Sequence, residues 1–370
     1  MAHSEYTDKM STDDTHQNLL RMGWTSHFQE QMENFCTYGL TPARVVGVRK
    51  NAFCISNGKN ERLATAAGRF KYHPDCIYPV TGDWVLMADS VISEVLARKN
   101  VLSRAAAGTR NSKDPQPHGN QLLAANLDTV FVVCGLDRDY NIRRIERYLT
   151  LVYNCGLNPA IILTKADLHQ DPAPFVAEVE SIAFGVPVHL VSALDCNGLL
   201  PLQKYLSPGQ TTTMIGSSGA GKSTLINRLY GKAVQATGSI SNSVGKGKHT
   251  TTNRDLIMMP QGGMVIDNPG IREIAFWDDD GGIQNAFPEI EHLAGECRFS
   301  DCSHSHEPGC RVLQAVADGE ISQDRLESYR KLKRELAYLS ERRHKSADRI
   351  EKERWKEVAL KIRSLKKGRI

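Results

Sequence analysis

A glycine-rich octapeptide near the middle of the chain reads Gly216-Ser217-Ser218-Gly219-Ala220-Gly221-Lys222-Ser223. It fits the P-loop pattern G-x-x-x-x-G-K-[ST]. The run 211–215 before it reads as a strand, and the residues after it read as the start of a helix. Backbone N–H groups of such a loop converge on phosphate oxygens, and the helix N-terminus adds its positive dipole end. Lys222 would reach the β- and γ-phosphates, and the Ser223 hydroxyl would bind Mg²⁺. A chance glycine turn is the alternative, and the strand, the Lys-Ser pair and the helix together argue against it.

A second motif, Thr164-Lys165-Ala166-Asp167, follows the apolar run 158–163. It resembles the N-K-x-D segment with which GTPases read guanine. A carboxylate at Asp167 can accept both N1–H and N2–H₂ of guanine, which adenine does not offer. Lys165 would lie along the base plane and brace the P-loop. Thr164 takes the place of the usual Asn, so we expect one bracing amide to be lost and the nucleotide affinity to be modest.

Two further segments complete the pattern. Ser192-Ala193 follows a second apolar run, 186–191, and resembles the S-A-x motif that supports the guanine. Asp267-Asn268-Pro269-Gly270 follows the apolar run 263–266 and matches D-x-x-G. Asp267 would hold Mg²⁺ through water, and the Gly270 N–H would sense the γ-phosphate. An ordinary turn can also spell D-x-P-G, but its place about forty-five residues after a P-loop favours the switch motif.

The order of these motifs is unusual. An ordinary GTPase places its base-reading segment well downstream of the P-loop. In this chain the only candidate, at Thr164, lies about fifty residues upstream of it. The sequence therefore predicts an α/β P-loop GTPase domain whose elements are circularly permuted.

The segment 238–252 lies between the P-loop and Asp267 and is rich in Gly, Ser and Lys. This composition is typical of a mobile switch loop, and a solvated linker is the alternative. One of the threonines 250–252 should bind Mg²⁺ and the γ-phosphate, with a slight preference for Thr251. Ile271 stands where related enzymes carry a water-orienting Gln, and an apolar side chain cannot orient water. His249 is the nearest imidazole in sequence and the catalytic candidate, although a lone loop histidine is often simply solvated.

Composition narrows the class of protein. A length of 370 residues predicts two or three domains. Nine Cys, mostly scattered, favour a reducing compartment without disulfides. The polar N-terminus lacks the apolar core of a signal peptide, and no run is long enough to cross a bilayer. We therefore expect a cytoplasmic protein with no membrane partner.

The net charge of +4 is unevenly spread. The segment 324–370 has about twice as many Lys and Arg as Asp and Glu, and its apolar residues have helical spacing. A basic amphipathic helix can face nucleic acid, a membrane or only water, and beside the other motifs nucleic acid is favoured.

Five short strand-like runs crowd into residues 41–104: 44–48, 52–55, 62–66, 83–87 and 91–96. This spacing predicts a small barrel of the OB type, a fold that often binds RNA. The polar stretch 105–119 reads as a linker, and 1–40 as an extension with one short helix. The GTPase domain would then span 120–282, and 283–370 would form a third, helical domain.

Four metal-ligand residues gather in this last domain: Cys297, Cys302, His304 and Cys310, spaced C-x₄-C-x-H-x₅-C. Three thiolates and one imidazole can close a tetrahedral zinc site with no open position, which is a structural rather than a catalytic arrangement. His306 is the competing nitrogen ligand, and a group of unrelated free thiols is the alternative.

The combination of an OB-like barrel, T-K-A-D, S-A, G-S-S-G-A-G-K-S, K-H-T-T-T, D-N-P-G and the Cys-His cluster resembles the small ribosomal subunit biogenesis GTPases of the RsgA/YjeQ family. The resemblance covers about residues 41–320 and implies slow GTP hydrolysis that the small (30S) ribosomal subunit stimulates. It also implies a role in late maturation of that subunit, binding to its 16S rRNA near the decoding region, one zinc per chain and Mg²⁺ with GTP. We expect a monomer.

The expected site residues follow from the motifs and the resemblance. Nucleotide contacts are expected from Thr164, Lys165, Asp167, Ser192, Ala193, Gly216, Ser217, Ser218, Gly219, Ala220, Gly221, Lys222, Ser223, Thr224 and Gly270. Mg²⁺ would be held by Ser223, Thr251 and Asp267, and zinc by Cys297, Cys302, His304 and Cys310. His249 and Lys222 are the catalytic candidates. Two other classes remain open: another P-loop enzyme, such as an ATPase or a GTPase of large-subunit assembly, and a nucleotide-dependent RNA-binding module with negligible turnover.

Overall fold

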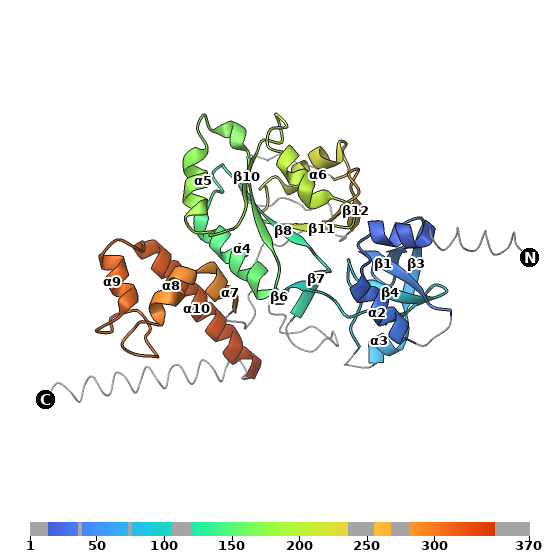
Figure 1. Ribbon diagram of the computed structural model, residues 1–370, viewed down its shortest axis with the longest axis horizontal. Coiled ribbons are helices and arrows are strands. Elements are labelled where there is room, and N and C mark those ends of the chain that lie inside the picture. The colour runs from blue at the N-terminus through green and yellow to red at the C-terminus, as the bar shows by residue number, and fades with distance from the viewer. Residues whose placement is uncertain are drawn as a thin grey trace, which may run out of the picture. The chain divides into compact units, whose positions relative to one another are not determined.

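The structure is a computed structural model that describes residues 14–35, 39–72, 76–105, 120–235, 255–267 and 281–344 (Figure 1). The chain divides into two units. The first comprises Met1–Arg104 with Gln121–Ile274, and the second comprises Ala105–Asn120 with Ala275–Ile370.

A six-stranded sheet carries the P-loop in the first unit. Its strand order is β10-β9-β8-β11-β13-β12. The strands are β8 (Thr129–Gly135), β9 (Pro159–Thr164), β10 (Val188–Val191), β11 (Thr211–Ile215), β12 (Leu256–Met258) and β13 (Met264–Ile266). All neighbours are parallel except β12 and β13. Strands β8 and β11 are buried along their whole length, as expected for parallel strands covered on both faces.

Each helix of this sheet follows one of its parallel strands. They are α4 (Ile142–Asn154), α5 (Ala173–Glu180) and α6 (Lys222–Tyr230), with short 3-10 turns η1 (Ala166–Leu168) and η2 (Leu200–Leu206). Leu225, Ile226 and Leu229 of α6 pack against Phe131 and Met214 of the sheet. Strand β9 leads into the T-K-A-D segment, and β11 leads into the P-loop. Both belong to one sheet with β8 between them, and β9 comes before β11 in the chain. The predicted circular permutation is therefore confirmed.

A closed five-stranded barrel precedes the sheet, with the order β1-β2-β3-β5-β4. Its strands are β1 (Thr41–Val48), β2 (Phe53–Ser56), β3 (Glu61–Ala66), β4 (Trp84–Ala88) and β5 (Val91–Val95), and α3 (Arg69–Tyr72) follows β3. The interior is filled by alternating apolar residues such as Val45, Phe53, Ile55, Val85 and Met87. The OB-type barrel expected from the strand spacing is confirmed.

The described part of the N-terminal extension contains two helical segments, 14–21 and α2 (Ser26–Asn34), where the sequence predicted one. Trp24, which lies between the two segments, and Phe28 of α2 pack on the buried Trp84 of the barrel. Their ring centroids are 4.8 Å and 5.9 Å from that of Trp84. The aromatic contacts explain the second segment, because burial of large rings stabilises a short helix that propensity alone would not.

Arg44 of β1 joins the barrel to the sheet. Its guanidinium donates to the carbonyls of Met22, Gly82 and Asn126 and contacts Met264 Sδ of β13. The side chain is fully buried, and burial lowers its pKa to about 10. One buried cation with three carbonyl partners thus links the N-terminal extension, the barrel and the sheet.

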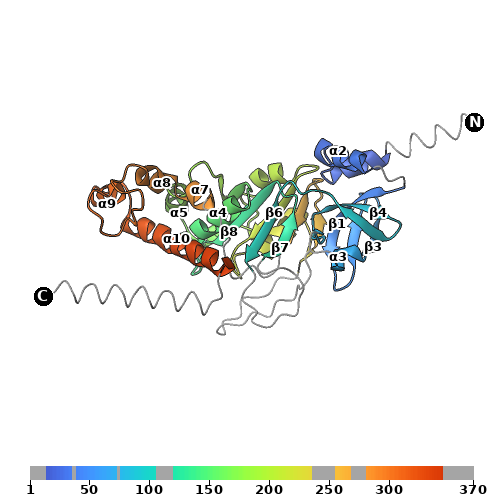
Figure 2. The same cartoon turned by 90° about the horizontal axis from the view of Figure 1, so that it is seen from below.

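Strands β6 (Val101–Ala105) and β7 (Asn120–Ala125) pair with each other in a two-stranded sheet, and Figure 2 shows them side by side. The predicted linker 105–119 falls almost entirely outside the described residues. The domain boundaries given above therefore stay predictions.

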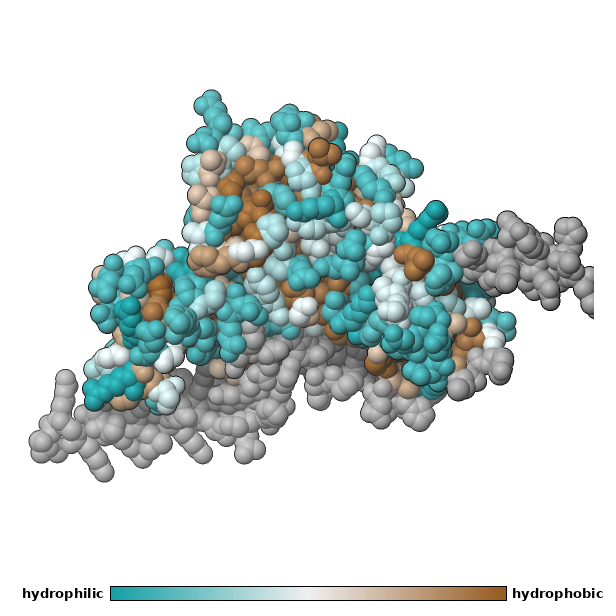
Figure 3. Space-filling view, in the orientation of Figure 1, coloured by the Kyte–Doolittle hydropathy of each residue, from teal (hydrophilic) through white to brown (hydrophobic). Residues whose placement is uncertain are grey.

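The second unit is helical: α7 (Gly281–Ala286), α8 (Pro288–Ala294), α9 (Arg311–Ala317) and α10 (Gln323–His344). Phe287 and Tyr329 are buried in it, with ring centroids 5.6 Å apart. None of the described helices has the length and apolar character that a bilayer crossing needs. On the face drawn in Figure 3 the described surface is mainly hydrophilic, and the main hydrophobic area lies over α5 and β10.

Candidate functional site

The P-loop lies between β11 and α6, where the sequence placed it. Gly216 has a φ of 154°, and a Cβ there would lie 2.2 Å from the Val133 carbonyl oxygen of β8. Only glycine lets the loop pass this close to the neighbouring strand. Helix α6 then begins at Lys222, directly after Gly221, so its free N–H groups face the loop. The geometry is that of an anion site.

Lys222, at the end of the P-loop, bonds back to its beginning. Its Nζ donates to the carbonyl oxygens of Gly216, at 2.8 Å, and Ser217, at 2.6 Å. These bonds hold the positive charge of the Lys222 ammonium at the loop. The site is therefore preorganised for phosphate, since no charge has to be moved in from solvent.

Thr164 braces the P-loop from β9. Its hydroxyl donates to the Ala220 carbonyl oxygen at 2.5 Å, and its Oγ1 would lie 3.3 Å from a Cβ on Gly221. We expected the replacement of Asn by Thr to remove a brace. The structure shows that the shorter hydroxyl reaches the loop because β9 brings it next to Ala220.

Asp167 and Ser192 come together from different strands. The Ser192 hydroxyl donates to Asp167 Oδ1 at 2.7 Å, and it also lies 3.2 Å from Asp195 Oδ2. Asp167 lies in η1 directly after β9, and Ser192 directly follows β10, with Ala193 next to it. The parallel pairing of β9 with β10 thus places Asp167, the predicted base-reading carboxylate, beside the S-A motif.

Lys165 has an ion-pair partner at the ends of β8 and β9. It has a left-handed φ of 60°, its stem passes over Gly135, and its Nζ pairs with Asp137 Oδ2 at 2.5 Å. The pairing fixes the long side chain, so the lysine is held along the edge of the sheet where β8 and β9 end.

Three residues of this edge were missed by the motif search. Asp139 accepts a hydrogen bond from the P-loop hydroxyl of Ser217, and Arg144 pairs with the same carboxylate at 2.7 Å. Although burial works against ionisation, the bonds from Arg144 and Ser217 hold the pKa of Asp139 below its usual value. Asp137 is the third. A signal was available, because Asp137 and Asp139 follow the apolar strand 129–135, and carboxyl ends of parallel strands meet at one edge.

Asp267 lies at the end of β13, next to β11 and the P-loop lysine. The residue is buried, and its backbone N–H donates to the Asp255 carbonyl oxygen at 3.1 Å. Burial raises the pKa of Asp267, the charge of Lys222 works in the opposite direction, and the charge of Asp255 adds to the rise. A buried carboxylate beside a phosphate loop is the kind of hard oxygen donor that Mg²⁺ prefers.

Several predicted residues lie outside the described residues. They are His249, Thr250, Thr251, Thr252, Asn268, Gly270 and Ile271. Their roles stay predictions.

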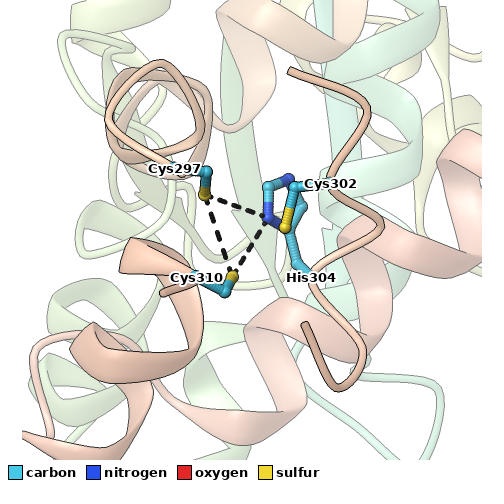
Figure 4. A group of neighbouring side chains, drawn as sticks. All are labelled: Cys297, Cys302, His304 and Cys310. Atoms are coloured by element: carbon cyan, nitrogen blue, oxygen red, sulfur yellow. Dashed lines mark hydrogen bonds between the residues drawn. The ribbon is translucent and has the colours of Figure 1, made fainter. Parts of the chain in front are cut away.

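The four predicted zinc ligands gather in the second unit (Figure 4). His304 Nδ1 lies 3.6 Å from Cys297 Sγ and 3.4 Å from Cys310 Sγ, and the two sulfurs are 3.8 Å apart. All four ligand atoms lie within 4.8 Å of one another. Tetrahedral zinc, with Zn–S of about 2.3 Å and Zn–N of about 2.0–2.1 Å, separates its ligand atoms by roughly 3.5–3.8 Å. The donor set and its spacing fit zinc. His306 is exposed and is not part of the group.

The surrounding residues hold these ligands in place. The Cys310 sulfur accepts the N–H of Leu313 at 3.4 Å and caps α9. The Glu307 carboxylate accepts the N–H groups of Ser303, at 3.0 Å, and Ser305, at 2.8 Å, and so fixes the turn that carries His304. This role of Glu307 was also missed. It resembles the outer-shell support that metal ligands commonly receive.

A P-loop braced by Thr164, a carboxylate at Asp167 backed by Ser192, and strands in permuted order define a circularly permuted P-loop GTPase. Comparison with known proteins gives the family. The RsgA GTPase model matches residues 95–277, and the chain belongs to the RsgA family. A second model, described as 50S ribosome-binding GTPase, matches 211–347. That match starts at β11, so the base-reading strand β9 lies outside it, as permutation requires.

Curated relatives match over most of the chain. A small ribosomal subunit biogenesis GTPase RsgA from Syntrophotalea carbinolica is 44% identical over 86% of this chain and 90% of its own length. A protein of the same name from Methanosarcina acetivorans is 46% identical over 78% of each chain. Among solved structures, YjeQ from Thermotoga maritima has a TM-score of 0.58 and 28% identity, covering 81% of this chain and 98% of its own. YloQ, a circularly permuted GTPase, has a TM-score of 0.56 at 22% identity over 83% of this chain and 98% of its own, and shows the fold alone.

Proposed function

We propose that this chain hydrolyses GTP on the small (30S) ribosomal subunit and acts in the late maturation of that subunit. The choice of GTP is supported mainly by the position of Asp167. Ser192 donates a hydrogen bond to its carboxylate, and Thr164, on the strand before Asp167, donates to the P-loop. The naming of relatives at 44% and 46% identity supports the ribosomal role. The cytoplasm, where small subunits mature, would be its location, and the monomeric state stays a prediction.

The nucleotide would lie along the edge where the parallel strands end. Asp167 would accept the guanine N1–H and N2–H₂, and the backbone from Gly216 to Thr224, with Gly270, would hold the phosphates. Lys222, already directed across the loop, would balance the charge that develops on the transferred phosphoryl group. Ser223, Thr251 and Asp267 would hold Mg²⁺, which supplies charge neutralisation between the β- and γ-phosphates when bound.

The attacking water needs a partner that the D-x-x-G segment does not supply. Ile271 is apolar, so basal turnover should be slow. We infer that docking on the subunit brings His249 toward this water, because it is the nearest imidazole in sequence to the switch threonines. The barrel and the basic segment 324–370 would make the docking contacts, mainly to 16S rRNA phosphates. The Cys₃His cluster would hold one structural zinc and fix the fold of the second unit.

The test is GTP hydrolysis measured with and without purified small subunits. We expect stimulation on the order of 10³-fold, since supplying a missing transition-state group has effects of this size. The stimulation should weaken with added salt, because phosphate contacts release counterions. Lys222→Ala should abolish turnover in both conditions. Large subunits and ATP serve as controls: stimulation by large subunits instead, or equal use of ATP, would favour the other P-loop classes. Binding without any turnover would favour an RNA-binding module.

His249 has a separate test. His249→Ala should lose mainly the subunit-stimulated rate, by roughly 10²-fold or more, and should still bind GTP. A variant that keeps full stimulated turnover would remove His249 from the mechanism and leave the ribosomal role intact.

A further inference from the structure

An arginine of the barrel reaches the strand that borders the magnesium site. Arg49 directly follows β1, and its guanidinium pairs with both carboxylate oxygens of Asp255: Nη1 lies 2.5 Å from Oδ1 and Nη2 lies 3.2 Å from Oδ2. The two side chains are 35% and 39% exposed. Asp255 precedes β12 in the sheet, so this bidentate pair joins the barrel to the GTPase sheet within the first unit.

Asp255 also holds Asp267 through the backbone. Its carbonyl oxygen accepts the Asp267 N–H at 3.1 Å and continues the antiparallel ladder in which Leu256 pairs with Ile266. Asp267 is thus hydrogen-bonded to Asp255, whose side chain is paired with Arg49 of the barrel.

The barrel leaves room for this contact at Gly47. Gly47 and Asp255 form an isolated antiparallel bridge, and β1 has a bulge between Val45 and Gly47. A Cβ on Gly47 would lie 2.5 Å from Asp255 Oδ1 and 3.0 Å from Arg49 Nη1. Any side chain there would displace the carboxylate. Bulges commonly aim a strand at a functional neighbour, and this one turns β1 toward Asp255.

We propose that Arg49 is a positioning residue for GTP hydrolysis: through Asp255 it holds Asp267 in place for Mg²⁺. The inference rests on the magnesium role proposed above for Asp267. Its consequence is mechanical. A barrel that shifts on docking pulls on Arg49, and the shift reaches Asp267 through one ion pair and one backbone hydrogen bond. No motif of the P-loop class includes Arg49 or Gly47, so the coupling belongs to the pairing of this barrel with this sheet.

The test measures how strongly Mg²⁺ improves binding of a non-hydrolysable fluorescent GTP analogue. In Arg49→Ala we expect the Mg²⁺ concentration for half-maximal improvement to rise about two- to fivefold, the range that a half-exposed ion pair can supply. Affinity measured in EDTA should not change, because Asp167 and the P-loop are untouched. Arg49→Lys should recover part of the loss, and Gly47→Ala should reproduce it with every charge retained. Arg62→Ala removes an exposed arginine of β3, on the same barrel, and should leave both values unchanged.

A double-mutant cycle separates positioning from general destabilisation. In an Asp255→Asn background, which keeps the backbone acceptor, Arg49→Ala should no longer shift the Mg²⁺ requirement. An equal shift in both backgrounds, or no shift in the natural background, would overturn the proposal. Stimulation by small subunits is measured in parallel on the unmodified chain. Absence of stimulation would count against the proposed ribosomal role alone, since the Mg²⁺ measurement does not use subunits.

Discussion

The Thr164 hydroxyl is the link between the base-reading strand and the phosphate loop. The Thr164 side chain is buried, and its hydroxyl donates to the Ala220 carbonyl oxygen at 2.5 Å. Removing the hydroxyl while keeping the shape leaves that carbonyl without its partner, which costs about 1–3 kcal/mol.

We therefore predict that Thr164→Val weakens GDP binding roughly tenfold. Thr164→Ser keeps the hydroxyl and should bind GDP within about twofold of the natural chain. Titration with fluorescent GDP measures both. Equal affinities of the Val and Ser variants would show that the bond does not support the loop.

In the proposed site, the carboxylate of Asp167 selects guanine by accepting its N–H groups. Asp167→Asn converts one acceptor into a donor, which faces the guanine N–H groups with the wrong sign. We predict a fall in GTP affinity on the order of 10²-fold and a smaller preference for GTP over ATP. Competition of ATP against a labelled guanine nucleotide measures the preference. An unchanged preference in the variant would move base recognition away from Asp167.

At the scale of single elements, a buried ion pair ties the ends of two barrel strands. Asp83 precedes β4, and Arg98 follows β5. The Arg98 guanidinium donates to both carboxylate oxygens of Asp83 at 2.7 Å. The Asp83 side chain is fully buried, and burial raises its pKa above the unfolded value even with Arg98 present. The folded state therefore binds a proton more readily at this carboxyl than the unfolded chain does.

The sign of the pH effect follows. Stability from a raised carboxyl pKa is fully present below the unfolded pKa and is lost as the pH rises through the folded one. Arg98→Ala should cost about 3–5 kcal/mol at neutral pH, because it leaves a buried charge unpaired. The cost should shrink as the pH is lowered toward the carboxyl range, since protonation then removes that charge. Urea unfolding at several pH values measures this, with Arg98→Ala/Asp83→Asn as the control that should show little pH dependence. A cost that stays the same at every pH would contradict the argument.

The elements differ in how far the sequence predicts them. The barrel strands were predictable because one face of each is buried, which leaves apolar residues at alternate positions in segments such as 44–48. The glycine and lysine positions of the P-loop were predictable because few other residues can hold phosphate there. Arg44 and Arg49 were not. A charged residue in or next to a strand is expected to face solvent, and only the packing of the barrel on the sheet shows that Arg44 is buried and that Arg49 is paired with Asp255. The Thr164 brace was missed for the same reason, since its partner Ala220 lies on another strand's loop.

At the scale of the whole molecule, the two units differ in what stabilises them. Among its described residues, the first has one hydrophobic core in the barrel and another around the sheet, and the buried Arg44 bonds to both the barrel side and the sheet side of the unit. The second has four described helices and the Cys₃His cluster. A small helical unit gains much of its stability from such a metal-linked cluster. The proposed ligands of the two units also differ in kind, because a nucleotide would bind at the P-loop and zinc at Cys302 and its neighbours.

This difference predicts two separable unfolding transitions in the calorimeter. GDP with Mg²⁺ at about 100 times its Kd should stabilise the first unit by about 2.7 kcal/mol and leave the second unchanged.

Cys302→Ala should lose the single zinc per chain and lower the transition of the second unit by on the order of 10 °C or more, since each 1 kcal/mol shifts a domain of this size by about 4–8 °C. Cys54→Ala, a thiol of the barrel, serves as the control and should keep the zinc. Metal analysis that finds no zinc in freshly purified, chelator-free protein would refute the assignment. A single transition that GDP and zinc loss both move would show instead that the two units unfold as one.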